Sequence, residues 1–520
     1  MRLFILLFNQ LLKPTATRFL LALENPKLSQ SKIQTQIFKN FLCSEYGKKV
    51  GIKSIEEWQQ IPIIKYHDIE KLISHKTNKT SPLTPEKILF YEKTSGSRAA
   101  AKLIPYTKSL RHSFNQMFCV WANDLITNGC KFSTGKTYFC ISPQLSNSSH
   151  ETIQNDSEYL DEWLRIILSP FLVFLPKINR IRNAEEFKYE LAKALITSEK
   201  LEIISIWSPT FLEVILDYIQ INRIKLATDL KNRISNQRQQ ILLSETFFPQ
   251  DLWKNLKLIS CWDSVNAADK ADYLRSKFPN VLVQGKGLLA TEAPMTIPLI
   301  AANGYVPVLD EVFFEFADVS GNIHLLHELQ IGENYEIIIS QKGGLYRYQI
   351  GDKVHVTHFY KNTPCLKFIG RTEEISDLVG EKLNLEFVRD VLDLLPLENC
   401  SFKSLVPVKH PQAHYLLLLN NTDIDIQNII EKLDRELQRS RHYQYARLLG
   451  QLQLPKVLAS PKIPEIISHY KISSGKKWGD IKHEVLVNQP IDNELFKLLV
   501  ESGKIITKKS KNILLFFQIF

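Results

Sequence analysis

The sequence predicts an α/β protein, because strand-like apolar runs alternate with helical patterns through the middle of the chain. The runs at residues 201–209, 256–262 and 281–292 include stretches with the length and composition of buried strands. Helical patterns at 211–221 and 267–278 lie between them. Strands separated by helices favour α/β layers, with ligand-binding groups at the carboxyl ends of the strands. We therefore expect a binding site along that edge of the sheet.

Size and composition fit a large globular chain. With 520 residues, 44% hydrophobic and 23% charged, it can form two or more domains with a sizeable core. The net charge of +10 is spread along the chain, so we expect no nucleic-acid partner and no nucleic-acid arm. An anionic small molecule explains the excess equally well. The seven cysteines include no CxxC pair and suggest reduced thiols in a cytoplasmic protein.

The chain begins with a short apolar run, MRLFILLFNQLL. It is too short to cross a bilayer and lacks a small-residue cleavage site, so an amphipathic first helix is favoured over a signal peptide. Helices are predicted over residues 1–75, with a proline-containing strap at 58–66 on the surface. We expect no integral membrane segment, and we expect a monomer.

A loop rich in small hydroxyl residues follows the first predicted strand. Backbone N–H groups and hydroxyls can donate to phosphate oxygens, and a lysine adds a point charge, as a triphosphate-binding loop requires. The loop does not match the GxxxxGK(S/T) pattern, and an ordinary turn remains the alternative. Its residues are Thr94, Ser95, Gly96 and Ser97, and it closes at Lys102 before a second strand at 103–106.

Further along the chain, a helix is predicted at 109–122, a strand at 136–143, and mainly helices up to residue 200. After the strand that begins at residue 281 comes Glu292. A carboxylate at the exit of a strand can hold Mg²⁺, which prefers oxygen ligands together with substrate phosphates. The alternative is an ordinary strand-end acid. In both cases we expect its side chain to face the surface.

Residues 343–383 are predicted to form a β-meander, preceded by a β-rich insertion at 310–339. We expect strands at 345–350 and 353–359, with Gly351 and Asp352 turning the chain between them. A carboxylate such as Asp352 can accept hydrogen bonds from a ribose diol. Arg371, at the end of a third strand, can reach nucleotide hydroxyls or phosphate with its forked donors. The alternative is a turn aspartate and a surface arginine.

The pattern then changes to a compact α+β unit that ends in a basic, mobile-looking segment at 471–486. We predict two domains, 1–373 and 374–520, with a hinge near residues 371–376. The elements of the second domain are helices at 386–394 and 426–440, and strands at 404–408, 415–419 and 452–458.

Several phrases together resemble one family. The loop TSGS with its lysine, the phrase GKGLLATE, and GLYRYQIGD followed by FIGR are similar to the Gretchen Hagen acyl acid amido synthetases. This family contains plant hormone-conjugating enzymes and bacterial homologues, and we expect this chain to be of the bacterial type. The family belongs to the acyl-adenylate-forming superfamily, together with firefly luciferase and the acyl-CoA synthetases.

The resemblance implies a large N-terminal adenylating domain, which binds ATP and the acyl acid, and a small mobile C-terminal lid. It implies adenylation of a carboxylic acid by ATP and Mg²⁺, followed by attack of an amino acid's amine to form an amide. The loop residues Thr94 to Ser97 and Lys102 would hold the phosphates, Glu292 the metal, Asp352 the ribose, and Arg371 would lie beside the nucleotide. The implied lysines of the hinge and the C-terminal domain are Lys382 and Lys482, with Lys476 as an alternative to Lys482. The implied acyl-pocket residues are Trp207, Ser208 and Phe211.

The sequence also departs from the family pattern at nucleotide-facing positions. Arg98-Ala99 stands where a small hydroxyl residue and glycine are usual, and Ala293 follows Glu292 where glycine is common. Ser264-Val265-Asn266 replaces a glycine-rich stretch. If the replaced glycines had positive φ, alanine would cost about 1 kcal/mol or more at each. We expect Arg98 to point into the nucleotide site. For the function of the whole chain, the alternatives to an amido synthetase are a non-catalytic homologue that binds a nucleotide or an acyl acid, and an acyl-CoA ligase.

Overall fold

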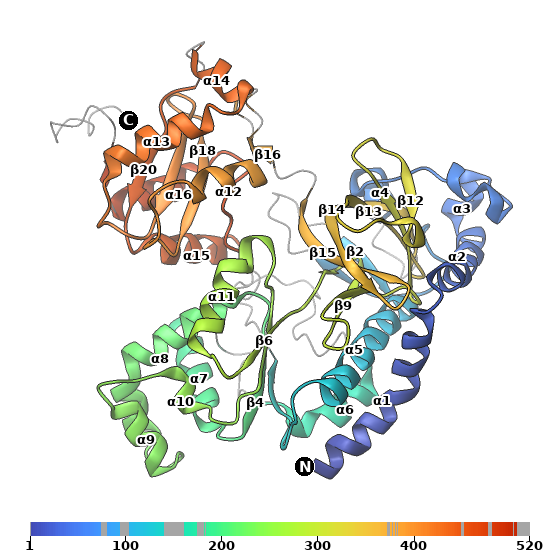
Figure 1. Ribbon diagram of the computed structural model, residues 1–520, viewed down its shortest axis with the longest axis horizontal. Coiled ribbons are helices and arrows are strands. Elements are labelled where there is room, and N and C mark those ends of the chain that lie inside the picture. Colours follow the sequence, from blue (N-terminus) through green and yellow to red (C-terminus); the bar gives the residue numbers. More distant parts are fainter. Residues whose placement is uncertain are drawn as a thin grey trace. The chain divides into compact units, whose positions relative to one another are not determined.

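The computed structural model describes residues 2–73, 81–93, 103–139, 161–173, 181, 184–371, 375–376, 378–379, 381, 383–448, 452–476, 481–502 and 504–506. The chain divides into two compact units (Figure 1). One contains Met1–Arg371, and the other contains the described residues from Ile375 onward. The predicted boundary between residues 373 and 374 lies within a stretch outside the description, so it stays a prediction.

The predicted α/β layers are present in the first unit. Four parallel strands pair in the order β3-β4-β5-β6, and helices surround this sheet (Figure 1). The strands are β3 (Lys136–Phe139), β4 (Leu201–Ser205), β5 (Leu258–Cys261) and β6 (Leu282–Gly285). The helices of this region are α6 (Glu162–Leu168), α7 (Ala184–Thr197), α8 (Pro209–Asp229), α9 (Asn236–Leu243), α10 (Pro249–Leu252) and α11 (Ala268–Lys277).

A second, antiparallel sheet in the same unit confirms the predicted β-rich region. Its five strands pair in the order β12-β11-β13-β14-β15. They are β11 (Val312–Ala317), β12 (Ile323–Leu325), β13 (Asn334–Gln341), β14 (Leu345–Tyr360) and β15 (Thr363–Arg371). Three short hairpins precede this sheet: β1 (Ile88–Lys93) with β2 (Leu103–Thr107), β7 (Leu289–Ala290) with β8 (Ala293–Pro294), and β9 (Thr296–Leu299) with β10 (Gly304–Pro307).

The predicted turn at Gly351 and Asp352 is wrong. Residues 345–360 form one long strand, and Asp352 lies inside it, opposite Arg371 of β15. Gly351 has φ +86°, which glycine adopts without a steric cost, so the strand carries an irregularity there instead of reversing. The consequence is that the Asp352 side chain has a fixed place in a sheet rather than in a loop.

Helices begin the chain as predicted: α1 (Arg2–Ala22), α2 (Pro26–Cys43), α3 (Glu45–Val50) and α4 (Tyr66–Ile73), with α5 (Lys108–Asn128) following β2. The strap does not lie on the surface throughout. Trp58 and Ile61 are buried, and Ile64 forms an isolated bridge with Tyr348 of β14. An apolar strap gains stability by covering the sheet, which ties the N-terminal segment to the second sheet.

The second unit is the predicted small α+β structure. Its sheet has the order β18-β19-β20-β21, with only the β19–β20 pair parallel. Asn384 caps the first helix by accepting a hydrogen bond from the Phe387 amide at 2.8 Å. The elements are β16 (Ile375–Ser376), β17 (Leu383–Asn384), α12 (Leu385–Asp393), β18 (Lys403–Val408), β19 (His414–Leu419), α13 (Ile426–Leu437), α14 (Arg441–Leu448), β20 (Lys456–Ala459), α15 (Ile463–Ser473), α16 (Asn493–Ser502) and β21 (Lys504–Ile506).

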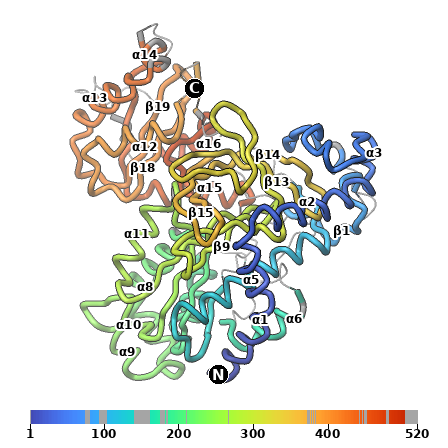
Figure 2. Tube along the Cα trace, turned by 45° about the vertical axis from the view of Figure 1, so that its right-hand side comes forward, coloured from blue at the N-terminus to red at the C-terminus, as the bar shows by residue number. Residues whose placement is uncertain are grey.

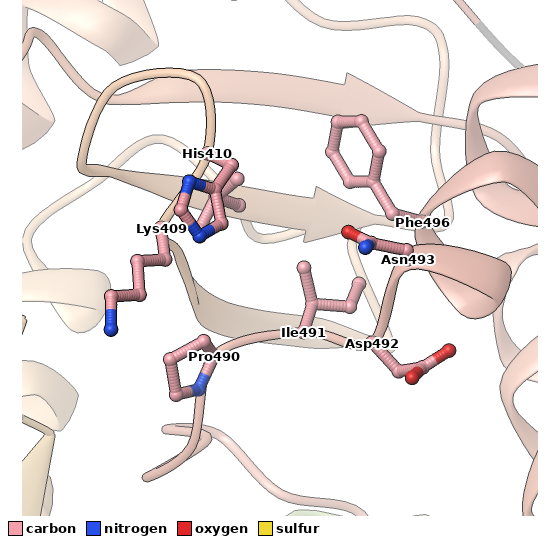
Figure 3. A pocket seen from close by; sticks show the side chains of 8 residues that line it. Lys409, His410, Pro490, Ile491, Asp492, Asn493 and Phe496 are labelled. Atoms are coloured by element: carbon pink, nitrogen blue, oxygen red, sulfur yellow. The ribbon is translucent and has the colours of Figure 1, made fainter.

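A pocket of about 290 Å³ lies within this second unit (Figure 3). Lys409 and His410, which follow β18, line it together with Asp492, Asn493 and Phe496 around the start of α16. No residue that the sequence predicts for a site is among its lining residues.

Candidate functional site

Glu292 lies in a cluster of tyrosines. The Tyr348 hydroxyl forms a hydrogen bond with Glu292, and the Tyr106 hydroxyl donates to the neighbouring Thr291 carbonyl at 2.9 Å. Burial, followed by the negative charge of Glu292, raises the pKa of Tyr348. Burial, with Glu292 again contributing, also raises the pKa of Tyr106 and of Tyr66. Tyr348 and Tyr106 are protonated at neutral pH, as an ordinary tyrosine is, and the raised pKa keeps them hydrogen-bond donors in alkaline solution as well.

The prediction that Glu292 faces the surface is wrong, because the residue is only 4% exposed. It occupies the tight turn between β7 and β8, and it lies against Tyr348 of the antiparallel sheet. A buried carboxylate is costly unless polar groups surround it, which the tyrosines do here.

The same cluster reaches the end of the predicted phosphate loop. The Tyr66 hydroxyl accepts a hydrogen bond from the Leu103 amide at 2.8 Å, and Leu103 directly follows Lys102. The charge of Glu292 acts on this same tyrosine, so Glu292 lies near the point where the loop ends. The loop residues themselves lie outside the described residues and stay predictions: Thr94, Ser95, Gly96, Ser97, Arg98 and Lys102.

Asp352 and Arg371 form a cross-strand ion pair. Arg371 Nε donates to Asp352 Oδ1 at 2.6 Å, and the aspartate is 1% exposed whereas the arginine side chain is 47% exposed. The charge of Arg371 also lowers the pKa of Tyr348, against the stronger effects that raise it. Glu292 and Arg371 therefore both act on Tyr348, and Asp352 is joined to this group through its ion pair with Arg371.

The donor set at Glu292 fits a magnesium ion that shares its ligands with a substrate. Mg²⁺ is commonly bound by one or two carboxylates together with phosphate oxygens and waters. In the part of the chain that the structure describes, no group of three or more His, Cys, Asp or Glu residues could hold a metal. A single carboxylate beside the end of a phosphate loop suits shared coordination rather than a dedicated metal cage.

A second group of residues lies at the carboxyl ends of the parallel strands. Lys286, directly after β6, donates from Nζ to Ser205 Oγ at 2.8 Å and lies 5.1 Å from the centre of the Trp207 ring. The Trp207 and Trp262 rings are 5.8 Å apart. The predicted wall residue Trp207 thus lies just beyond the carboxyl end of β4, with a cation against its ring. Lys286 was not predicted as a site residue, although a lysine directly after a buried strand indicates a ligand-binding position.

The other two predicted wall residues are buried. Ser208 directly precedes α8 and is 4% exposed. The Phe211 ring lies 6.3 Å from that of Phe187 on α7, inside the helical layer. Phe211 therefore packs between helices, whereas Trp207 contacts Lys286.

Asp263 organises the loop after β5. It accepts hydrogen bonds from the Tyr305 hydroxyl at 2.8 Å and from Arg275 Nη2 at 3.2 Å. A Cβ on Gly285 would lie 2.1 Å from Asp263 Oδ1, so only glycine fits below this carboxylate. The partners of Asp263 come from three separate segments, and no local pattern in the sequence indicates them.

The departures from the family pattern have different structural consequences. Val265 has φ +54°, a left-handed conformation that is a genuine outlier for a β-branched residue. Ala293 has no such backbone; it lies in β8 and pairs with Ala290. The alanine after Glu292 is thus unstrained, and the loop after β5 carries the conformation that glycine would tolerate.

Replacing Val265 with glycine should stabilise the protein by about 1 kcal/mol, because left-handed backbone costs a residue with a Cβ about 1–2 kcal/mol and glycine almost nothing. Thermal unfolding of Val265→Gly and of Val265→Ala measures this. The alanine variant keeps the Cβ and should gain less. Equal melting temperatures for the glycine variant and the parent would contradict the strain.

The predicted lysines of the hinge and the C-terminal domain are only partly described. Lys482 is exposed in a segment that runs beside β18, where the Leu405 amide donates to the Val485 carbonyl at 2.7 Å. Lys476 is half-buried, and its amide donates to the Lys471 carbonyl at 3.0 Å. Lys382 lies outside the described residues. The roles of all three lysines stay predictions.

Comparison with known proteins identifies the family. Successive parts of the chain match three family models, the GH3 family N-terminal domain over residues 15–283, the GH3 family central domain over 305–371 and the GH3 family C-terminal domain over 386–491. The chain therefore belongs to the GH3 family, as its motifs predicted. The central model ends at the residue where the first compact unit ends.

Individual relatives are distant. The chain is 27% identical over 180 residues to jasmonoyl–L-amino acid synthetase JAR6 of Nicotiana attenuata, a match covering 30% of this chain and 31% of that protein. The matches to JAR6, to JAR4 of the same species and to jasmonoyl–L-amino acid synthetase GH3.5 of rice (Oryza sativa subsp. japonica) thus span between 21% and 38% of those proteins.

Solved structures share the whole fold. The acyl acid amido synthetase AtGH3.15, solved in complex with 2,4-DB, is similar with a TM-score of 0.81 at 17% identity, covering 94% of this chain and 96% of that one. A 2-hydroxyisobutyryl-CoA ligase in the postadenylation state is similar with a TM-score of 0.50 at 11% identity, covering 94% and 91%. The predicted fold class is confirmed.

Proposed function

We propose that this chain uses ATP to adenylate a carboxylic acid and then transfers the acyl group to the amine of an amino acid. A carboxylate oxygen attacks the α-phosphorus and pyrophosphate leaves; the amine then attacks the acyl carbonyl, AMP leaves and an amide forms. The observation that carries the proposal is the linked group of Glu292, Tyr348, Arg371 and Asp352, in a chain of the GH3 family. The names of its relatives, amino acid synthetases, support the second step.

The described residues have distinct parts in this reaction. Asp352 would accept hydrogen bonds from the ribose hydroxyls, and its ion pair with Arg371 holds the carboxylate in a fixed orientation. Tyr348, whose pKa is raised mainly by burial, keeps its proton and orients the Glu292 carboxylate. Glu292 would hold Mg²⁺, which when bound neutralises phosphate charge.

The cysteines among the described residues are all free thiols, which suits a reducing cytoplasm.

Two other functions stay open to test. The strained Val265 and the substituted loop at Arg98 favour a homologue that binds nucleotide without turnover. The similarity of the fold to that of an acyl-CoA ligase makes thioester formation the other alternative function. Mass spectrometry of reactions that contain ATP, Mg²⁺, an acid and either amino acids or coenzyme A separates them. Amide products support the proposal, thioesters support the ligase, and ATP binding without either product supports the non-catalytic homologue.

Lys286 is expected to select the acid. An ammonium between Ser205 and the Trp207 ring can bind a polar or anionic substituent of the acyl group. Lys286→Met should lower kcat/KM for acids with such a substituent by roughly 10- to 100-fold relative to apolar acids. The matched control is Lys277→Met, because Lys277 Nζ also lies over an aromatic ring, that of Tyr273, at 5.3 Å. An unchanged ratio in the Lys286 variant would remove this residue from the acid site.

A further inference from the structure

Helix α1 has two apolar faces, and only one of them contacts the core. Five residues face inward and are nearly buried: Ile5, Phe8, Leu12, Ala16 and Phe19. On the other face Leu3, Leu7 and Leu11 recur at i, i+4 and i+8, so they form one stripe along the helix. They are 70%, 57% and 61% exposed. Large apolar side chains in a contiguous exposed stripe mark an interaction surface.

The exposed stripe has an apolar neighbour. Leu164 and Leu168 of α6 belong to the same buried apolar cluster as Phe8 and Leu12 of α1, and α6 lies near α1 in both views (Figures 1 and 2). The outward residues of α6 are Trp163, which is 43% exposed, and Ile166, which is 65% exposed. Both helices thus present apolar side chains to solvent. We call the exposed residues Leu3, Leu7 and Leu11 the α1 face.

The charges carried by α1 itself have one sign. Residues 1–23 contain three cations, Arg2, Lys13 and Arg18, and no acidic residue. Arg18 is occupied by Asp310 and Gln116, whereas Arg2 and Lys13 are exposed. A helix with exposed leucines and only basic charges matches a surface that is apolar below and anionic above.

We propose that the α1 face binds an anionic lipid surface, with α1 lying in the plane of the interface. Its leucines would enter the acyl boundary, and Arg2 and Lys13 would meet lipid phosphates. A second copy of the chain is a poorer partner, since a two-fold contact through one patch sets its cations against the same cations. Helices within the described residues are too short or too polar to span a bilayer, so the contact is peripheral.

Sedimentation of the full chain with vesicles tests the proposal, using phosphatidylcholine alone and phosphatidylcholine mixed with phosphatidylglycerol. The parent should bind the mixed vesicles and bind the neutral ones weakly. Leu7→Gln/Leu11→Gln should lower binding by roughly tenfold or more, because burial of each leucine is lost. The matched control is Ile221→Gln/Ile224→Gln on α8, whose isoleucines are 80% and 63% exposed; this variant should bind like the parent.

Other outcomes would overturn the proposal. Equal binding by the Leu7/Leu11 variant and the parent, with both folded by circular dichroism, would show that α1 is not the contact. No binding to either vesicle would do the same. Sedimentation velocity that shows a parent dimer, lost in the Leu7/Leu11 variant, would assign the face to a second copy. Vesicle binding that depends only on residues 507–520, tested by their deletion, would move the contact to that segment.

Discussion

Glu292→Gln is expected to lower magnesium-dependent pyrophosphate exchange by roughly 100-fold or more, because charge stabilisation at a reacting phosphate is usually the largest catalytic effect. The amide keeps the size of the side chain, and the Tyr348 hydroxyl can still donate to its oxygen. The buried turn between β7 and β8 should therefore stay intact. Exchange of labelled pyrophosphate into ATP, measured over a range of Mg²⁺ concentrations, gives the result.

A second buried glutamate is the control for this variant. Glu202 is 1% exposed and lies in β4, where it accepts hydrogen bonds from Lys257 at 2.7 Å and from the Gly135 amide at 2.7 Å. Glu202→Gln should lower the melting temperature without lowering exchange per folded molecule. If Glu292→Gln behaves in the same way, with normal exchange, Glu292 has a structural role only.

Arg347→Met should destabilise the first unit by about 3–5 kcal/mol, because it leaves a buried carboxylate without its cation. Arg347 is 3% exposed; its Nε donates to Glu315 Oε2 at 3.0 Å, and its Nη1 donates to the carbonyls of Gln59 and Ile61 at 2.7 and 2.8 Å. The arginine thus joins the strap to the antiparallel sheet. Urea unfolding followed by tryptophan fluorescence reports the loss, since Trp58 donates to the same glutamate.

Two further variants separate charge from packing. Arg347→Met/Glu315→Gln removes both charges, so it should recover part of the stability lost in the single variant. Arg435→Met is the control for an exposed ion pair: Arg435 is 3.2 Å from Glu436 with its side chain 69% exposed, and the change should be within about 0.5 kcal/mol. A small effect of Arg347→Met would mean that the pair does not hold the strap.

The sequence predicted the strands and helices of the α/β layers well, because apolar runs and caps are local signals. β4 and β5 lie inside the predicted strands, and α12 (Leu385–Asp393) differs by one residue at each end from the helix predicted at 386–394. The break of β14 at Gly351 was predicted wrongly. A Gly-Asp pair suits a turn, and only pairing with the neighbouring strands keeps the chain extended.

The candidate site was predicted in pieces and without its surroundings. Motif resemblance selected Glu292, Asp352 and Arg371, which the structure links through Tyr348 and through the Asp352–Arg371 ion pair. The motifs did not indicate that Glu292 is buried. They also did not indicate that its charge raises the pKa of Tyr66, since these two residues lie in distant parts of the chain. Long-range contacts of this kind leave no periodic pattern in the sequence.

Acid-dependent exchange of pyrophosphate into ATP tests the proposed adenylation most directly. The parent protein, given ATP, Mg²⁺ and each of a panel of carboxylic acids, should incorporate labelled pyrophosphate with at least one acid, and omission of the acid or of Mg²⁺ should abolish this incorporation. Calorimetry should show ATP binding in the same preparation. Binding of ATP with no exchange for any aromatic, aliphatic or substituted acid would contradict the proposal and leave a nucleotide-binding homologue.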